Sequence, residues 1–143
     1  MIAEIRTFID STIKSVNSKY QGNTKPFEDL GNVVSTKMDY TYHVDIGAAA
    51  IEIGNELGNV ANIEVILRLF RHGGSKKLDN YDEGYCEALL MNGLLVDNSR
   101  LNGTECIMGI TTSSVNPVEV DGSQDLYSFE STLTFKISYG IGE

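Results

Sequence analysis

Residues 126–139 read LYSFESTLTFKISY, and this stretch decides the fold. From Phe129 to Tyr139 every second residue is apolar except Ser131, and polar residues fill most positions between. A period of two is that of a β-strand, whose side chains point alternately to its two faces. The stretch therefore predicts a strand with one face in a core, ended by Gly140.

The first residues of the chain follow a helical period instead. Ile5, Ile9 and Ile13 recur at steps of four, with Ile2 and Val16 in line at the two ends. This spacing forms one apolar stripe along an amphipathic helix over about residues 3–18.

Two more segments alternate with a period of two. Residues 39–46 place apolar side chains on one face and polar ones on the other, which predicts a half-buried strand with a solvated polar face. The polar set is Asp39, Thr41, His43 and Asp45. The run 48–53 either continues this strand past a bulge or returns as its partner. Residues 63–69 form a further strand, joined through a turn at 54–59 that is short enough for a hairpin.

A second helix is predicted over about residues 78–92, because carboxylates gather in its first turns, where they suit the positive end of the helix dipole. Asn92-Gly93 is a helix-stop signal, followed by a further short turn of helix at 94–101. The expected buried stripe is Tyr81, Tyr85, Cys86 and Leu89. Residues 106–115 predict a strand that ends at the turn signal Asn116-Pro117.

These elements define the fold class. Helix, strands, helix and strands follow one another through hairpin-like links, so we expect an α+β fold with a largely antiparallel β-sheet. The N-terminal amphipathic helix and the second helix should pack on one face of that sheet. A length of 143 residues and a hydrophobic content of 41% suit one core, so residues 1–143 are predicted to form a single domain.

Acidic residues outnumber basic ones, 20 to 11, and the net charge is −9. Binding to the phosphate backbone requires Lys and Arg that neutralise phosphates, so this composition argues against DNA binding. An acidic surface instead repels DNA, which suits a protein that DNA must slide past without sticking.

The opening residues lack the unbroken apolar core of a signal peptide, and no window approaches the roughly 20 apolar residues that span a bilayer. The chain is therefore expected in a cytosol and away from membranes. Cys86 and Cys106 are the only cysteines, and we interpret them as buried, reduced thiols.

No motif for catalysis, a cofactor or a metal stands out. His43 and Asp45 lie two positions apart on a predicted strand and share a face, but no nucleophile sits at a strained turn such as G-x-S-x-G. Zinc needs clustered Cys and His, and the segment 73–76 does not match a phosphate-binding loop. We therefore expect neither an enzyme nor a bound cofactor.

Basic charge concentrates around one loop, at Arg68, Arg71, Lys76 and Lys77. Two interpretations are open. The residues form either a solvated loop or a patch that contacts an acidic surface of a subunit or partner.

The C-terminal strand also carries a family likeness. Residues 126–139 resemble the final strand of the tail terminator proteins of long-tailed bacteriophages, the family of the lambda minor tail protein U, which ends in the form polar-x-apolar-x-apolar-x-Tyr. The order of elements, the length and the acidity are similar too, whereas residues 17–37 and 54–62 carry no likeness. Head–tail connector and head-completion proteins have similar sizes and related folds.

The resemblance implies a structural protein of the virion tail or neck, assembled in the host cytoplasm. It implies a six-fold ring of identical chains that sits on the last ring of the tail tube, stops tube growth and contacts the head connector or stopper protein. DNA would pass through without specific binding. A head-completion or neck connector protein is the alternative within this class. A small cytosolic ligand-binding module or enzyme that uses the His43/Asp45 face is the alternative from a different class.

Overall fold

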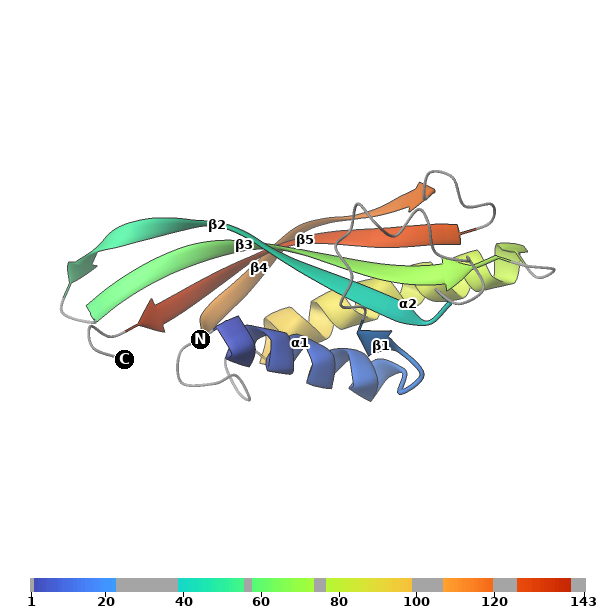
Figure 1. The fold of residues 1–143 in the computed structure, drawn as a ribbon, viewed down its shortest axis with the longest axis horizontal. Coiled ribbons are helices and arrows are strands. Elements are labelled where there is room, and N and C mark those ends of the chain that lie inside the picture. Colours follow the sequence, from blue (N-terminus) through green and yellow to red (C-terminus); the bar gives the residue numbers. More distant parts are fainter. Residues whose placement is uncertain are drawn as a thin grey trace.

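The computed structural model describes residues 2–22, 39–55, 58–73, 77–98, 107–119 and 126–139. In chain order, these ranges form α1 (Ile2–Val16), β1 (Gln21–Gly22), β2 (Thr41–Asn55), β3 (Gly58–His72), α2 (Lys77–Asn98), β4 (Ile107–Glu119) and β5 (Leu126–Tyr139). Both helices lie on one side of a long, twisted sheet (Figure 1). The predicted α+β class is confirmed.

The strands form one sheet in the order β1-β2-β3-β5-β4. Every neighbouring pair is antiparallel except β1 and β2, which pair in parallel over two residues. The predicted C-terminal strand is confirmed as β5, which lies between β3 and β4. Phe129 and Leu133 are fully buried opposite Leu69 and Val65 of β3, so the alternation read in the sequence is that of a strand inside the sheet.

The predicted N-terminal helix is confirmed as α1. Three isoleucines of its apolar stripe are fully buried, namely Ile5, Ile9 and Ile13. Each contributes about 1.5–3 kcal/mol by leaving water. Two polar contacts attach α1 to β2: Arg6 Nη1 donates to the Val44 carbonyl at 3.2 Å, and the Tyr42 hydroxyl donates to the Asp10 carboxylate.

β2 and β3 form the predicted hairpin. β2 continues past an irregularity between Ile46 and Ala49, so the run 48–53 extends the strand and is not a separate partner. The turn is shorter than the predicted 54–59, because β2 extends to Asn55 and β3 starts at Gly58.

The second helix is confirmed, but the predicted stop at Asn92-Gly93 is wrong. α2 runs from Lys77 to Asn98 through both residues. Asn92 is buried, and its Nδ2 donates to the Ala88 carbonyl and to Ser131 Oγ, each at 2.7 Å. Because this amide finds its partners within the helix and on β5, it does not compete with the helical backbone.

The buried stripe of α2 also differs from the prediction. It consists of Gly84, Ala88, Met91, Asn92 and Leu95. The two tyrosines of the predicted stripe pack against the core, but Leu89 is 53% exposed and Cys86 is exposed. A Cβ on Gly84 would lie 2.6 Å from Cε2 of Phe129. The missing side chain lets this face approach the sheet, and Leu89 then points outward.

β4 is an edge strand and continues to Glu119 through Asn116 and Pro117, so the predicted turn there is wrong. Proline has no N–H to donate, and an edge strand tolerates it because one side of the strand needs no partner. Cys106, the other predicted buried thiol, lies outside the described residues. Neither helix in the described ranges is long and apolar enough to span a bilayer.

Candidate functional site

The four basic residues singled out in the sequence do not form one described patch. Arg68 and Arg71 both belong to β3, three positions apart, so their side chains point to opposite faces of the sheet. They are only 8% and 1% exposed, so a solvated loop is the wrong interpretation for them. Lys76 and the side chain of Lys77 lie outside the described residues. A contact with a subunit or partner through the four stays a prediction.

Arg71 lies on the helix side of the sheet, at the centre of a network of charged and aromatic groups. Its guanidinium donates to Asp39 Oδ1 at 3.2 Å, to Glu83 Oε1 at 3.2 Å and to Glu87 Oε1 at 2.6 Å. The Tyr40 hydroxyl accepts from Nη2 at 3.0 Å, and the Tyr40 ring centroid lies 4.0 Å from the guanidinium carbon. The network joins β3, α2 and the residues that precede β2, so it fixes the helix against this end of the sheet.

The network also sets the ionisation of its members. Burial, followed by the Glu87 carboxylate, raises the pKa of Tyr20 above its ordinary value of 10.0, and the Tyr20 hydroxyl donates to Glu87 Oε1 at 3.1 Å. Burial by itself would lower the pKa of Arg71, but Tyr20, Tyr40 and Glu87 act against it and the pKa is raised. Arg71 therefore stays charged and Tyr20 stays a neutral donor near neutral pH.

On the opposite face, His43 and Asp45 share one side of β2, as predicted. His43 Nδ1 lies 3.5 Å from Asp45 Oδ1, and Arg68 Nη1 pairs with the other oxygen of that carboxylate. Arg68 Nε donates to Glu130 Oε1 at 3.0 Å. His43 is 7% exposed, so the prediction of a simply solvated face is wrong here. Together, His43, Asp45, Arg68 and Glu130 form a row of charged and polar side chains that joins β2, β3 and β5. Within this row the Asp45 carboxylate is held in an ion pair with Arg68.

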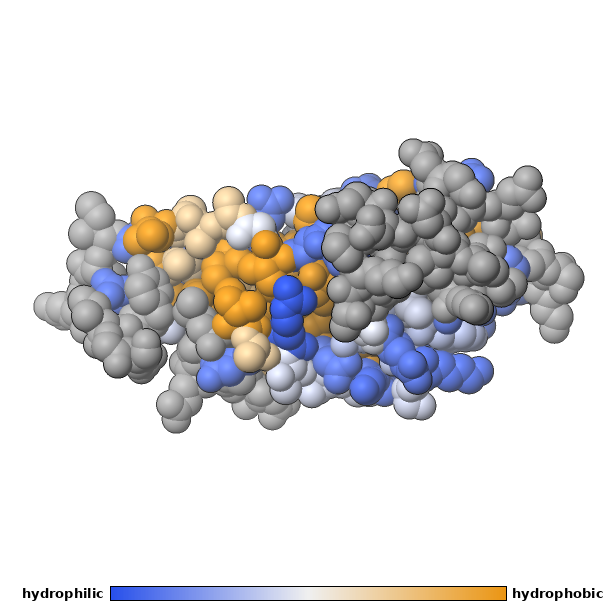
Figure 2. Space-filling model, viewed as in Figure 1, coloured by the Kyte–Doolittle hydropathy of each residue, from blue (hydrophilic) through white to orange (hydrophobic). Residues whose placement is uncertain are grey.

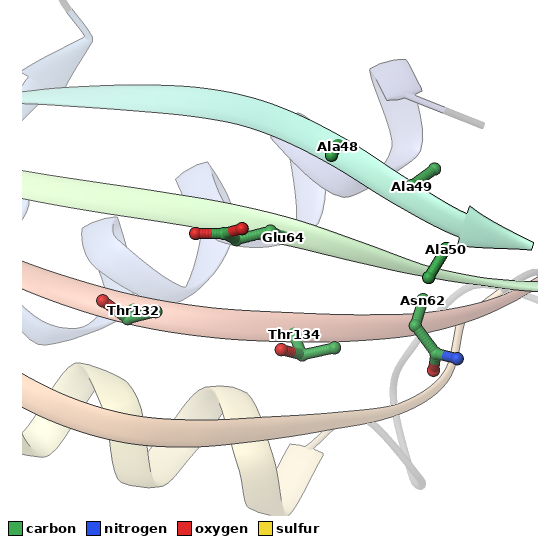
Figure 3. A pocket seen from close by; sticks show the side chains of 7 residues that line it. All are labelled: Ala48, Ala49, Ala50, Asn62, Glu64, Thr132 and Thr134. Atoms are coloured by element: carbon green, nitrogen blue, oxygen red, sulfur yellow. The ribbon is translucent and has the colours of Figure 1, made fainter.

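A shallow hollow of about 370 Å³ lies farther along this face (Figure 3). It is lined by Ala48, Ala49 and Ala50 of β2, Asn62 and Glu64 of β3, and Thr132 and Thr134 of β5. Both helices lie behind the strands in this view, while the side chains of Glu64, Thr132 and Thr134 lie in front. Small side chains and one exposed carboxylate line the hollow, which suits contact with another surface. No part of the described chain gathers three or more His, Cys, Asp or Glu side chains around a possible metal position.

Two edges of the sheet have no further strand beside them within the described ranges. β1 pairs with only Thr41 and Tyr42, which leaves β2 open from His43 to Asn55, and β4 pairs with β5 alone. Figure 2 shows hydrophobic residues gathered in the left half, where β2 runs in Figure 1, whereas hydrophilic residues lie over α1. The open edges are the strongest candidates for contacts between protein chains.

Comparison with known proteins gives a likeness in fold and none in sequence. No protein-family model matches the chain, and no curated protein matches it in sequence. Among solved structures, a chain of the virion of native gene transfer agent (GTA) particle is similar, with a TM-score of 0.55 and 11% sequence identity, over 96% of this chain and 91% of that chain. At this identity the likeness shows the fold, which this chain therefore shares along almost its whole length with a component of a gene transfer agent particle.

Proposed function

We propose that this chain is a structural protein of a phage-like virion that caps the tail tube and joins the tail to the head connector as a ring of identical subunits. The observation that carries the proposal is the fold shared with a chain of the gene transfer agent virion over 96% of this chain and 91% of that one. Because both chains are covered almost completely, the likeness concerns the whole fold and not a common substructure.

The two open edges support assembly into a ring. They lie at opposite ends of the strand order, one on β2 and one on β4. A contact between two different surfaces of identical chains is heterologous, and it closes into a ring when the rotation between neighbours allows. Six subunits follow from the resemblance of the C-terminal strand to tail terminator proteins.

The distribution of charge supports a ring that DNA passes through without being held. The chain carries a net charge of −9. On the helix-free face Glu52 and Glu64 are exposed, and Arg68 is held by Asp45 and Glu130. Among the described residues of this face, the carboxylates of Asp45, Glu52, Glu64 and Glu130 outnumber the cations Arg68 and Lys136, of which Lys136 is exposed. A bore lined by this face would therefore carry net negative charge and repel phosphates.

The proposed partners are the tail tube protein on one side of the ring and the head connector or stopper protein on the other. A neck connector would use the same ring but would bind the head side alone. The component that the ring binds therefore separates the two assignments.

Light scattering and negative-stain microscopy test the proposal. By light scattering, the protein alone should give a mass of about six times that of the 15.7 kDa chain. By microscopy, the same ring should be seen on tail tubes polymerised from the tube protein of the same particle. Tubes should end in a cap and stop growing, and an unrelated acidic protein of similar size should leave growth unchanged. A protein that stays monomeric and never caps a tube would sink the proposal. A ring that binds only the head connector would assign it to the neck.

A further inference from the structure

The two open edges lie level with each other across the sheet. Ala49 of β2 pairs with Ile63 of β3, Ile63 pairs with Phe135 of β5, and Phe135 pairs with Ile110 of β4. The adjacent row consists of Ala50, Asn62, Lys136 and Gly109. A rotation about an axis along the strands, without any shift, therefore brings residues 49–50 of one chain beside residues 109–110 of the next.

The strand directions also fit. β2, β3, β5 and β4 alternate in direction, because each neighbouring pair is antiparallel. Rotation about an axis along the strands preserves direction, so β4 of one chain would run antiparallel to β2 of the next. Antiparallel pairing forms the more stable ladder.

Both edges lack the charges that usually prevent pairing. Natural edge strands are often protected by charged side chains, above all lysine. β2 has no charged residue from Ile46 to Ile51, and β4 has none from Ile107 to Val118. Strand irregularities do interrupt both edges, but β2 is regular over 49–52 and β4 over 109–112, and without any shift these segments meet at residues 49–50 and 109–110. Pro117, the one residue of β4 without an N–H, lies outside its segment.

We propose that copies of this chain join edge to edge, with Gly109 and Ile110 of β4 pairing antiparallel with Ala50 and Ala49, respectively, of β2 in the next copy. The partner is thus a second copy of the same chain, and the inference rests on the proposed self-assembly. A head-to-tail contact of this kind uses one edge from each side of every copy, so a closed ring leaves no copy with an unused pairing segment.

Disulfide cross-linking between single-cysteine chains tests the pairing. In a background with Cys86→Ser and Cys106→Ser, one chain carries Ala50→Cys and the other carries Gly109→Cys. Ala50 is exposed, and a Cβ on Gly109 meets no other atom within 4 Å, so neither change should disturb the fold. Directly opposed residues of an antiparallel pair have Cβ atoms about 4.5–5.5 Å apart, close enough for a disulfide after a small adjustment.

After mild oxidation, the mixture of the two chains should give a covalent dimer on a non-reducing gel, and each chain alone should stay uncross-linked. A chain with both cysteines should give a ladder that ends at the complete ring. The matched control combines Ala50→Cys with Gly93→Cys, which lies on exposed helix surface and whose Cβ also meets nothing within 4 Å. This control mixture should remain uncross-linked.

The outcomes separate the pairing from the proposed function. Homodimers of either single-cysteine chain would indicate pairing of two like edges and overturn the inference. A ring seen by light scattering in the absence of the mixed cross-link would also overturn it, while the proposed function would stand. Monomers with and without tail tubes would remove both.

A pair of charge substitutions gives an independent measurement. Ile51→Lys places a lysine directly beside the proposed pairing, one residue after Ala50, at a side chain that is 73% exposed in the isolated chain. It should shift the mass from that of the ring towards 15.7 kDa without lowering the unfolding temperature. The control is Leu89→Lys, the same kind of change at a helix residue that is 53% exposed, and it should leave the ring intact. If both variants lost the ring to the same extent, or if both kept it, the result would count against edge pairing.

Discussion

Arg71 Nη1 lies 2.6 Å from Glu87 Oε1, in a pair whose side chains are only 1% and 12% exposed. The pair connects β3 to α2 across the layer between sheet and helices. Ion pairs this deeply buried matter chiefly through what remains when one partner is removed, because the other charge is left without compensation.

Arg71→Met should therefore lower the free energy of unfolding by about 3–5 kcal/mol, because it leaves Glu87 buried without its partner. Lys14→Met is the matched control. Lys14 pairs with Asp10 at 3.4 Å, but the two side chains are 51% and 35% exposed, so its loss should cost less than about 1 kcal/mol. Urea unfolding followed by circular dichroism measures both. Similar midpoints for the two variants would show that the Arg71 network does not hold α2 to the sheet.

The raised pKa of Tyr20 makes stability depend on alkaline pH. Above about pH 10 an unfolded tyrosine loses its proton, while the folded Tyr20, with its pKa raised by burial and by Glu87, keeps it. The folded state then binds more protons, so stability is fully present below about pH 10 and falls as pH rises. Each such tyrosine contributes a slope of up to about 1.4 kcal/mol per pH unit.

Tyr20→Phe should make this fall shallower. At neutral pH the variant loses the hydrogen bond to Glu87, so it should be less stable than the parent, but its stability should decline less between about pH 10 and about pH 11.5. Urea midpoints at a series of pH values measure both effects. An unchanged slope would mean that Tyr20 ionises in the folded state as readily as in the unfolded one.

The strands and α1 could be predicted because their side chains repeat with the period of the element. β5 alternates between core and polar residues along its length, and α1 places an isoleucine on the core at every fourth position. Each pattern can be read within a single segment of the sequence, because one face of the element is buried and its apolar residues recur with the period of that element.

The parts that could not be predicted depend on contacts between distant segments. Asn92-Gly93 has the sequence of a helix stop, yet the partner that keeps Asn92 inside the helix is Ser131, 39 positions away. Arg71 could have been placed on the core face by continuing the alternation of β3 beyond Leu69, but the positions of Asp39 and Glu87 around it follow only from the folded chain.

The two glycines of α2 should respond in opposite ways to the same substitution. A Cβ on Gly84 would lie 2.6 Å from Cε2 of Phe129 and 2.9 Å from Cγ of Arg71, so Gly84→Ala should overpack the layer and cost about 1–3 kcal/mol. Gly93 has no atom within 4 Å of such a Cβ, so Gly93→Ala should stabilise the helix by about 0.5–1 kcal/mol. Thermal and urea unfolding measure the pair. Stabilisation by both changes would mean that α2 does not pack on the sheet at Gly84.

The hydrogen bonds of the buried Asn92 side chain should contribute more to the free energy of unfolding than an exposed hydrogen bond of similar length. Asn92 donates to Ser131 Oγ at 2.7 Å and accepts from Thr112 Oγ1 at 3.1 Å, so it connects α2 to both β5 and β4. Asn92→Ala leaves Ser131 buried without this partner and should cost about 1–3 kcal/mol, even though alanine favours the helix. Asn116→Ala is the control, because Asn116 is exposed and donates to Ser114 Oγ at 3.1 Å, and surface changes of this kind usually stay within about 0.5 kcal/mol. Urea unfolding measures the loss of unfolding free energy in each variant. If Asn92→Ala and Asn116→Ala lost equal amounts, the buried amide would contribute no more than a solvated one, and helix propensity would be the better explanation for the continuity of α2.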